Sequence, residues 1–307
     1  MAQVGDDSLS KNFFEHSYQL RDMRQEPLTN VYWSCTDRAS EVYGTVYFIH
    51  GYGGSPVEPC LKVPMMHALS SGFDVVALEG VDFSATCGNA KNIDNMTLMR
   101  QKKALRRGLA YCRRIPDLSH KNNIAWAHSM SCRALSDLMV DSVFVRNYFS
   151  SVVLNNPYMM APDKVMQLKQ RLVQVDPTGK KWNDFTQRTS VSSRNIESHS
   201  YQVPTRLRNL LIPLPPNWDI DVPDFKLLAR RMSYFIGNLY VYFVLGTGDN
   251  MSDYNQNMQF FLGLKNDDKE LVCINGANHS FENAIAEYER SSSWILETIK
   301  RRKIYGK

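Results

Sequence analysis

Three separate segments of the sequence carry the side chains that a nucleophilic hydrolysis mechanism needs. Ser129 lies between the apolar run "NIAWAH" and a segment of helical character, and Asp249 and His279 follow later apolar runs, in "LYVYFVLGTGDN" and "ELVCINGANHSFEN". A serine hydroxyl is a weak nucleophile near neutral pH, so it needs a nearby base and a carboxylate that orients that base. We interpret Ser129 as the nucleophile, His279 as the base and Asp249 as the acid, with Asp253 as the alternative acid.

The residues around Ser129 indicate a sharp turn from a strand into a helix. In such a turn, glycine is usual two positions before and two positions after the serine, because the chain approaches itself closely there. Here these positions hold Ala127 and Ser131, the next smallest side chains. Taken alone, the segment is equally typical of a serine that simply begins a helix. The acid and the histidine that follow later strands favour the catalytic interpretation.

A second segment, "VYFIHGYGGSP", runs from an apolar strand into a glycine-rich turn. Backbone N–H groups in such a turn can stabilise a developing oxyanion, and glycine permits the close approach. The alternatives are an ordinary strand-to-helix turn or a phosphate-binding turn. The glycine spacing and the absence of a following Walker lysine disfavour phosphate binding. We therefore expect a supporting loop made of His50, Gly51, Gly53 and Gly54.

The elements that must position these residues are indicated by apolar runs at long intervals. Strands are predicted at 42–49, 73–79, 123–128, 151–156, 239–245 and 270–274, each buried on both faces. Helical stripes lie between them, such as the stripe of Met96, Met99, Leu105, Leu109 and Cys112 and the stripe of Ile285, Tyr288, Ser292, Ile295 and Ile299. This alternation predicts an α/β fold with a mostly parallel central sheet flanked by helices.

The whole chain, 1–307, is predicted to form a single domain. More than eighty residues without a convincing strand separate Asn156 from Leu239. A loop of that length is usually functional or carries helices of its own. We expect residues 157–236 to form an insertion that covers one end of the sheet.

Together, "HGYGGSP", "GFDVVALEG", "AHSMS", "GTGDN" and "GANHSFE" resemble the α/β-hydrolase superfamily, over roughly residues 40–300. The nearest resemblance is to the monoacylglycerol-lipase and lysophospholipase-like branch, whose corresponding turn reads G-H-S-M-G. The resemblance implies a Ser129–His279–Asp249 triad, an oxyanion hole formed by the N–H groups of Tyr52 and Met130, and a helical lid at 157–236. One departure is "EGVDFSATCGN", which stands where the family commonly has D-x-x-G-x-G-x-S.

The predicted function is that of a serine esterase or lipase, which cleaves acyl esters through an acyl-enzyme intermediate. Apolar residues in "NLLIPLPPNW", within an otherwise polar insertion, favour a lipid-like ester, although such residues can also simply hold the insertion against the body. The same triad serves thioesterases, acyltransferases and amidases, so these remain alternatives. A non-catalytic binding protein on the same scaffold is the alternative from a different class.

Charge is distributed unevenly along the chain, whose net charge is +5. Residues 163–208 contain nine basic and four acidic side chains, which favours peripheral contact with an anionic membrane; ordinary solvation of a polar segment is the alternative. No recognised motif accompanies these residues, so nucleic-acid binding is disfavoured. The oligomeric state is not predicted.

The remaining sequence features concern cofactors and location. The six cysteines lack metal-ligand spacing, so we expect neither a metal nor an organic cofactor. No secretory signal begins the sequence, and the longest apolar stretch is far too short to span a membrane. We therefore expect a cytoplasmic protein, or one exported without a cleavable signal.

Overall fold

The computed structural model describes residues 13–38, 41–51, 54–80, 98–159, 225–236, 239–249 and 251–305. Its elements are β1 (His16–Arg21), β2 (Pro27–Ser34), β3 (Gly44–Ile49), α2 (Pro59–Ser70), β4 (Phe73–Gly80), α3 (Leu98–Cys112), β5 (Ile124–His128), α4 (Met130–Asp141), α5 (Val143–Tyr148), β6 (Ser151–Asn155), α10 (Phe225–Phe235), β7 (Tyr240–Gly246), α11 (Tyr254–Gly263), β8 (Lys269–Ile274), a 3₁₀ turn (Glu282–Ala284) and α12 (Ile285–Tyr305).

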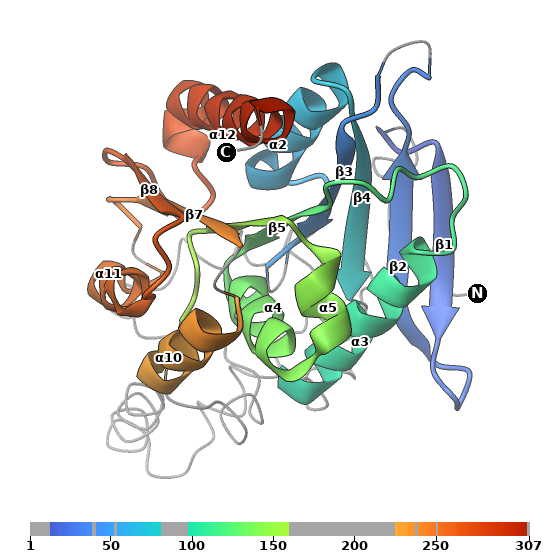
Figure 1. Cartoon of the computed structure of the whole chain (residues 1–307), viewed down its shortest axis with the longest axis horizontal. Coiled ribbons are helices and arrows are strands. Elements are labelled where there is room, and N and C mark those ends of the chain that lie inside the picture. The colour runs from blue at the N-terminus through green and yellow to red at the C-terminus, as the bar shows by residue number, and fades with distance from the viewer. Residues whose placement is uncertain are drawn as a thin grey trace, which may run out of the picture.

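The strands form one eight-stranded sheet in the order β1-β2-β4-β3-β5-β6-β7-β8. Strands β3 to β8 are parallel to one another and correspond to the six predicted strands. Helices α2 and α12 cover one face, and α3, α4 and α10 cover the other (Figure 1). The predicted fold class, a mostly parallel α/β sheet flanked by helices, is confirmed. The carboxyl ends of the parallel strands share one edge of this sheet, where side chains from distant segments can meet.

The sequence did not indicate the first hairpin, β1–β2, which is antiparallel and extends the sheet beyond β4. Strand β1 is exposed along almost its whole length, so it has no apolar run. Its turn uses no glycine: the Asp22 carboxylate accepts the backbone N–H groups of Arg24 and Glu26 at 2.8 and 3.1 Å, and Gln25 has a left-handed φ of 63°. Because Thr29 pairs with Gly80 at the end of β4, this turn lies at the carboxyl edge of the sheet.

Two expectations about burial are wrong. Strand β8 is the edge of the sheet and is only partly buried, so it is not covered on both faces. On α3, Met99 is 57% exposed, and Met96 lies outside the described residues. Leu105, Leu109 and Cys112 of the predicted stripe are buried, but at the start of the helix Leu98 is buried instead of Met99. The buried face of α3 also includes Gln101, Ala104 and Gly108.

Most of the predicted insertion, residues 160–224, lies outside the described residues. Its final segment is α10, whose Leu228, Ala229 and Met232 are buried in the same hydrophobic core as α3 and α4. Helix α10 therefore belongs to the layer that supports the sheet. Every helix in the described part of the chain is too short or too polar to cross a bilayer.

Candidate active site

Ser129 occupies a strained turn between β5 and α4, as the sequence predicts. Its backbone has φ 56° and ψ −126°, a conformation that non-glycine residues rarely adopt and that costs on the order of 1–3 kcal/mol. The turn is held by its neighbours, because the Ser129 N–H donates to the Asn155 carbonyl at 3.0 Å and the Ser129 carbonyl accepts the N–H of Tyr158 at 3.1 Å. The strain directs the hydroxyl away from the helix, toward the carboxyl edge of the sheet.

The three predicted catalytic side chains form one hydrogen-bonded line. His279 Nε2 lies 2.8 Å from Ser129 Oγ, and His279 Nδ1 lies 2.7 Å from Asp249 Oδ2. Asp253 does not take part: its carboxylate accepts the N–H of Gln256 at 3.1 Å and caps α11. The structure therefore brings Asp249, rather than the alternative acid, to the histidine.

Asp249 stays ionised although it is buried. Burial opposes the charged form, but the hydrogen bond from His279, the charge of that ring and donors on the following loop outweigh it and lower the pKa of Asp249. Those loop donors are the N–H groups of Met251 and Ser252, at 2.8 and 3.1 Å, and the Ser252 hydroxyl. An ionised carboxylate on Nδ1 leaves Nε2 free to accept the serine proton.

His128, directly before the nucleophile, packs its ring against the ring of His279 with centroids 4.9 Å apart. Burial, followed by the proximity of His279, lowers the pKa of His128 to about 3. The ring is therefore neutral near pH 7, and its Nδ1 lies 3.1 Å from the Asn155 carbonyl, which only a protonated Nδ1 can contact favourably. A neutral neighbour would not oppose a positive charge on the His279 ring.

The glycine-rich loop begins against the nucleophile. A Cβ added at Gly51 would lie 2.8 Å from the Cβ of Ser129, so only glycine fits at this approach. His50 Nδ1 lies 2.7 Å from the Gly51 carbonyl, and the Gly54 N–H donates to the same carbonyl at 3.3 Å, which closes the turn. Tyr52 and Gly53, predicted as an oxyanion donor and a loop residue, lie outside the described residues.

The other predicted oxyanion donor, Met130, is the first residue of α4. The first N–H groups of a helix have no partner within the helix, and they carry partial positive charge. An N–H group at the start of a helix can stabilise a negative oxygen beside Ser129.

Ser131 does more than keep the turn uncrowded. Its side chain is fully buried, its hydroxyl donates to the His50 carbonyl, and it accepts the Gln101 side-chain N–H at 2.8 Å. This chain of hydrogen bonds joins α3, the start of α4 and the end of β3. The serine that replaces the usual glycine thus ties the nucleophile turn to the glycine-rich loop.

Two asparagines at the end of β6 were not identified from the sequence. The Asn155 carbonyl accepts from Ser129, as described above, and its side chain donates to the Tyr288 hydroxyl at 2.9 Å. Asn156 has a left-handed φ of 40°; its Nδ2 donates to the carbonyls of Asn278 and His279 at 3.2 and 2.8 Å, and its Oδ1 accepts the Gly246 N–H at 2.7 Å. The signal available was a polar pair ending an otherwise apolar strand.

Glu58, before α2, was also not identified from the sequence. Its Oε1 accepts the Ser55 N–H at 3.0 Å, and a Cβ added at Gly54 would lie 2.8 Å from its Oε2. Burial raises the pKa of Glu58 to about 7, while the Ser55 N–H, the Cys60 thiol and His279 lower it and Glu282 raises it. A carboxyl group that titrates near neutral pH therefore supports the end of the glycine-rich loop.

No group of three metal-ligating side chains occurs among the described residues, and the five cysteines that the structure describes are unpaired. The site as described contains a hydroxyl, an imidazole and a carboxylate in one hydrogen-bonded line, with a helix N-terminus beside them. Such a set can perform acyl transfer.

Comparison with known proteins finds similarity only at the level of structure. No protein-family model matches the sequence, and no curated protein sequence matches it. Solved structures that are similar include a highly thermostable carboxyl esterase from Bacillus coagulans (13% identity, TM-score 0.62, covering 92% of this chain and 97% of that chain). Est1E from Butyrivibrio proteoclasticus has 13% identity and a TM-score of 0.60, over 92% and 98% of the two chains.

A soluble variant of monoglyceride lipase from Saccharomyces cerevisiae is also similar, with 15% identity and a TM-score of 0.53, over 88% of this chain and 92% of that chain. These likenesses extend over nearly the whole length of both partners. They show that the chain has the α/β-hydrolase fold.

Proposed function

We propose that this protein is a serine hydrolase that cleaves carboxylic esters. The observation that carries the proposal is the line from Ser129 Oγ through the His279 ring to Asp249 Oδ2, with steps of 2.8 and 2.7 Å. These distances are those of a nucleophile in contact with its base and of a base held by its acid. Similarity of fold to several esterases agrees with this proposal, although fold alone does not determine function.

In the proposed reaction, Ser129 Oγ attacks the ester carbonyl carbon while His279 Nε2 takes the hydroxyl proton. The carbonyl oxygen becomes an oxyanion, which the N–H groups of Met130 and Tyr52 would stabilise. Collapse of this intermediate breaks the bond to the alcohol, which leaves with the proton from His279, and an acyl-Ser129 ester remains. Water then attacks that ester with His279 again as base, which releases the carboxylic acid and restores Ser129.

The substrate class that we propose is an acyl ester of lipid-like character. The support is the apolar segment of the insertion, together with the structural likeness to a monoglyceride lipase that was solved with a substrate analogue. Another similar esterase, Est1E, was solved with ferulic acid bound, so the same fold also accepts an aromatic acid. We further propose that the part of 157–236 preceding α10 acts as a lid, and that its basic residues contact anionic membrane.

The alternatives use the same site. A thioesterase, an acyltransferase or an amidase would form the same acyl-Ser129 intermediate and differ only in the leaving group or the acceptor. A non-catalytic binding protein would keep the fold without an activated serine. Purified protein tested on a butyrate ester, the matching thioester and the matching anilide separates the esterase, the thioesterase, the amidase and the binding protein, and transfer of the butyryl group to an added alcohol identifies the acyltransferase.

We expect the ester to be hydrolysed fastest, and the Ser129→Ala variant to lose roughly four to six orders of magnitude in turnover with unchanged folding. Hydrolysis that is unchanged in the Ser129→Ala variant would contradict the proposal. Equal inactivity of the folded wild type on all three substrates would favour the binding protein.

A further inference from the structure

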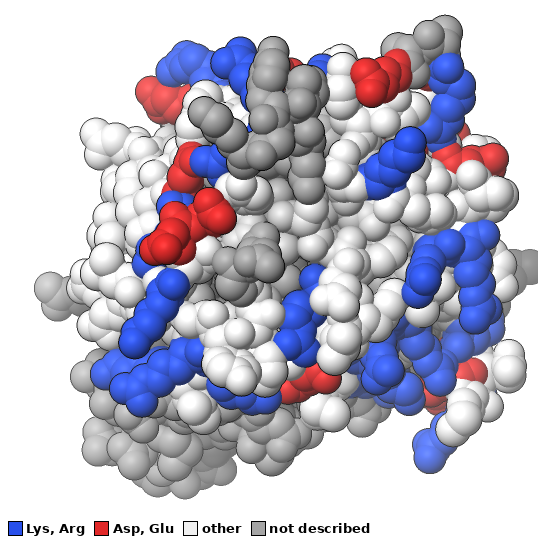
Figure 2. Space-filling model, in the orientation of Figure 1, with Lys and Arg blue, Asp and Glu red and all other residues white. Residues whose placement is uncertain are grey.

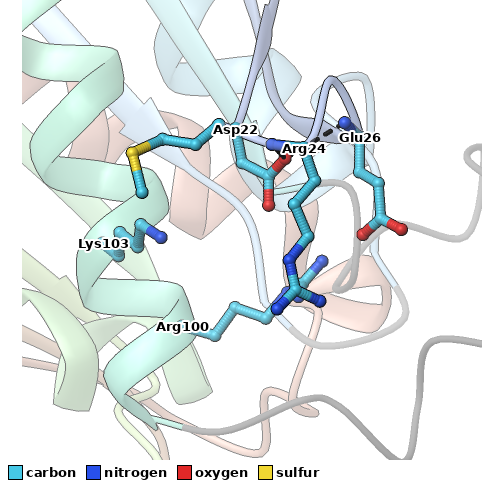
Figure 3. Close-up of a pocket in the computed structure, with 6 residues that line it drawn as sticks. Asp22, Arg24, Glu26, Arg100 and Lys103 are labelled. Atoms are coloured by element: carbon cyan, nitrogen blue, oxygen red, sulfur yellow. Dashed lines mark hydrogen bonds between the residues drawn. The ribbon is translucent and has the colours of Figure 1, made fainter.

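A basic hollow lies outside the candidate active site, between the β1–β2 turn and α3. It has a volume of about 370 Å³ and is lined by Asp22, Met23, Arg24, Glu26, Arg100 and Lys103. Figure 3 shows Arg24 from the turn and Arg100 from the helix extending into the same space, while the Glu26 carboxylate points away from α3. The Asp22 carboxylate is engaged by the backbone N–H groups of its own turn. The hollow is therefore lined by three cationic side chains and two acidic ones, so the cationic side chains outnumber the acidic ones by one.

The basic character continues along α3. This helix contains Arg100, Lys102, Lys103, Arg106 and Arg107 and no acidic residue. Lys102 pairs with Asp141, and Arg107 donates to the Arg21 carbonyl, which fixes α3 against the hairpin. In Figure 2, Lys and Arg side chains gather at the lower right, over the region of β1, β2 and α3 in Figure 1. We call the β1–β2 turn and the outward side of α3 the basic face.

Exposed apolar side chains accompany these charges. Met23, at the tip of the turn, is 87% exposed, and Met99, one helical turn before Lys103, is 57% exposed. Flexible apolar side chains among cations are typical of surfaces that rest on a bilayer, where the cations meet lipid phosphates and the apolar groups enter the acyl boundary. A surface for nucleic acid has no need of exposed methionines and gains more from aromatic side chains that stack on bases.

The basic face also lies at the end of the molecule where the candidate active site lies. The β1–β2 turn is at the carboxyl edge of the sheet, because β2 pairs with the end of β4. The first turn of α3 presents Arg100 to the hollow, and its next residue, Gln101, donates to Ser131 Oγ, two residues from the nucleophile. A bilayer in contact with this face would therefore lie beside the site.

We propose that the basic face docks on the surface of an anionic lipid bilayer, with a lipid phosphate in the hollow and Met23 and Met99 in the interfacial region. This extends the proposed function, on which it rests, because it places the source of a lipid ester next to Ser129. Docking through the basic face does not involve residues 160–224.

The test measures sedimentation of the purified full chain with vesicles of phosphatidylcholine, with and without phosphatidylserine, at low and high salt. The variant Arg24→Gln/Lys103→Gln/Arg106→Gln removes three exposed charges of the basic face. The control Lys62→Gln/Arg290→Gln/Arg301→Gln removes the same charge from exposed positions on α2 and α12, over the opposite face of the sheet. We expect wild-type binding only to anionic vesicles and weakening with salt, a loss of about 100-fold in the first variant, and little change in the control.

A second variant, Met23→Ser/Met99→Ser, should weaken vesicle binding while it leaves the salt dependence unchanged. Hydrolysis of a small soluble ester should be equal in all four proteins. Equal losses in the first variant and the control, binding that persists in the first variant, or tight binding to duplex DNA without binding to anionic vesicles would each overturn the proposal. Failure of the proposed function would appear separately, as absent hydrolysis of the soluble ester in a wild type that still binds vesicles.

Discussion

At the scale of single residues, Ser131 shows how this chain manages without the usual glycine after the nucleophile. Its hydroxyl bonds the His50 carbonyl and accepts from Gln101. Ser131→Ala should therefore lower kcat/KM by about tenfold, the usual effect of losing one buried hydrogen bond, because the glycine-rich loop loses its tether. Ser131→Val should lower it further, since the position is fully buried and the added methyl group crowds the turn.

The matched control for Ser131 is Ser136→Ala, on the same helix. Ser136 is equally buried, and within the described part of the chain its hydroxyl has no hydrogen-bond partner. Steady-state kinetics on a soluble ester should leave Ser136→Ala at wild-type activity. If both alanine variants lose activity alike, the effect belongs to helix packing and not to the Ser131 hydroxyl.

Asn156 is the residue that joins the nucleophile side of the site to the histidine side. Removing its amide in Asn156→Ala frees the carbonyls of Asn278 and His279, so the His279 ring loses its fixed position. A displacement of about 1 Å in a catalytic group can cost about 100-fold in rate, and we expect kcat to fall by about 10- to 100-fold with little change in KM.

Asn156 also has the left-handed φ of 40°, so strain and hydrogen bonding must be separated. Asn156→Gly accepts that φ freely but makes no side-chain hydrogen bond. The glycine variant should be as slow as the alanine variant. Full activity of Asn156→Gly would show that backbone conformation, and not the amide, is what matters.

At the scale of elements, Glu58 at the start of α2 should make the stability of the fold depend on pH. The pKa of Glu58 rises from 4.5 to about 7 on folding, because burial disfavours the carboxylate. A raised acid pKa stabilises the fold at pH values below the unfolded pKa, and this contribution is lost as the pH rises through about 7. Between pH 5 and pH 8.5 the wild type should therefore lose about 1–3 kcal/mol of unfolding free energy through Glu58. The Glu58→Gln variant keeps the acceptor for Ser55 but does not titrate, so it should not show this loss.

Denaturant unfolding of both proteins at these two pH values measures the change for Glu58. The nearby titratable groups are Cys60, His279 and Glu282, and all of them are present in both proteins, so they cancel in the comparison. An identical pH dependence of wild type and variant would mean that Glu58 is solvated and titrates normally.

The elements that the sequence predicts well are those with continuous apolar runs. Strands β3 to β7 are buried on both faces, so their sequences are apolar throughout. Together with β8, their parallel order places Ser129, Asp249 and His279 at one edge. Strand β1 was missed because it is exposed and polar. The roles of Asn156 and Glu58 were missed because they depend on contacts between loops that are distant in the sequence, which no local pattern records.

At the scale of the whole molecule, the sheet brings three features to one edge. The triad stands at the ends of β5, β7 and β8, the glycine-rich loop at the end of β3, and the basic face beside β4 (Figure 1). Helix α3 connects them, since one of its turns contacts both the hollow and Ser131. The proposed membrane-docking surface and the triad would thus lie on the same sheet and helix, and not on separate domains.

The central claim, that Ser129 is an activated nucleophile, is tested most directly by the rate of labelling with a fluorophosphonate, followed by mass mapping of the modified peptide. We expect rapid, single labelling at Ser129 and none in Ser129→Ala. We also expect labelling slowed by about 10³- to 10⁴-fold in Asp249→Asn, the size of effect known for loss of the orienting acid, and unchanged labelling in Asp253→Asn, where the asparagine can still cap α11. Folded wild-type protein that is not labelled, or is labelled at another residue, would show that Ser129 is not the activated nucleophile.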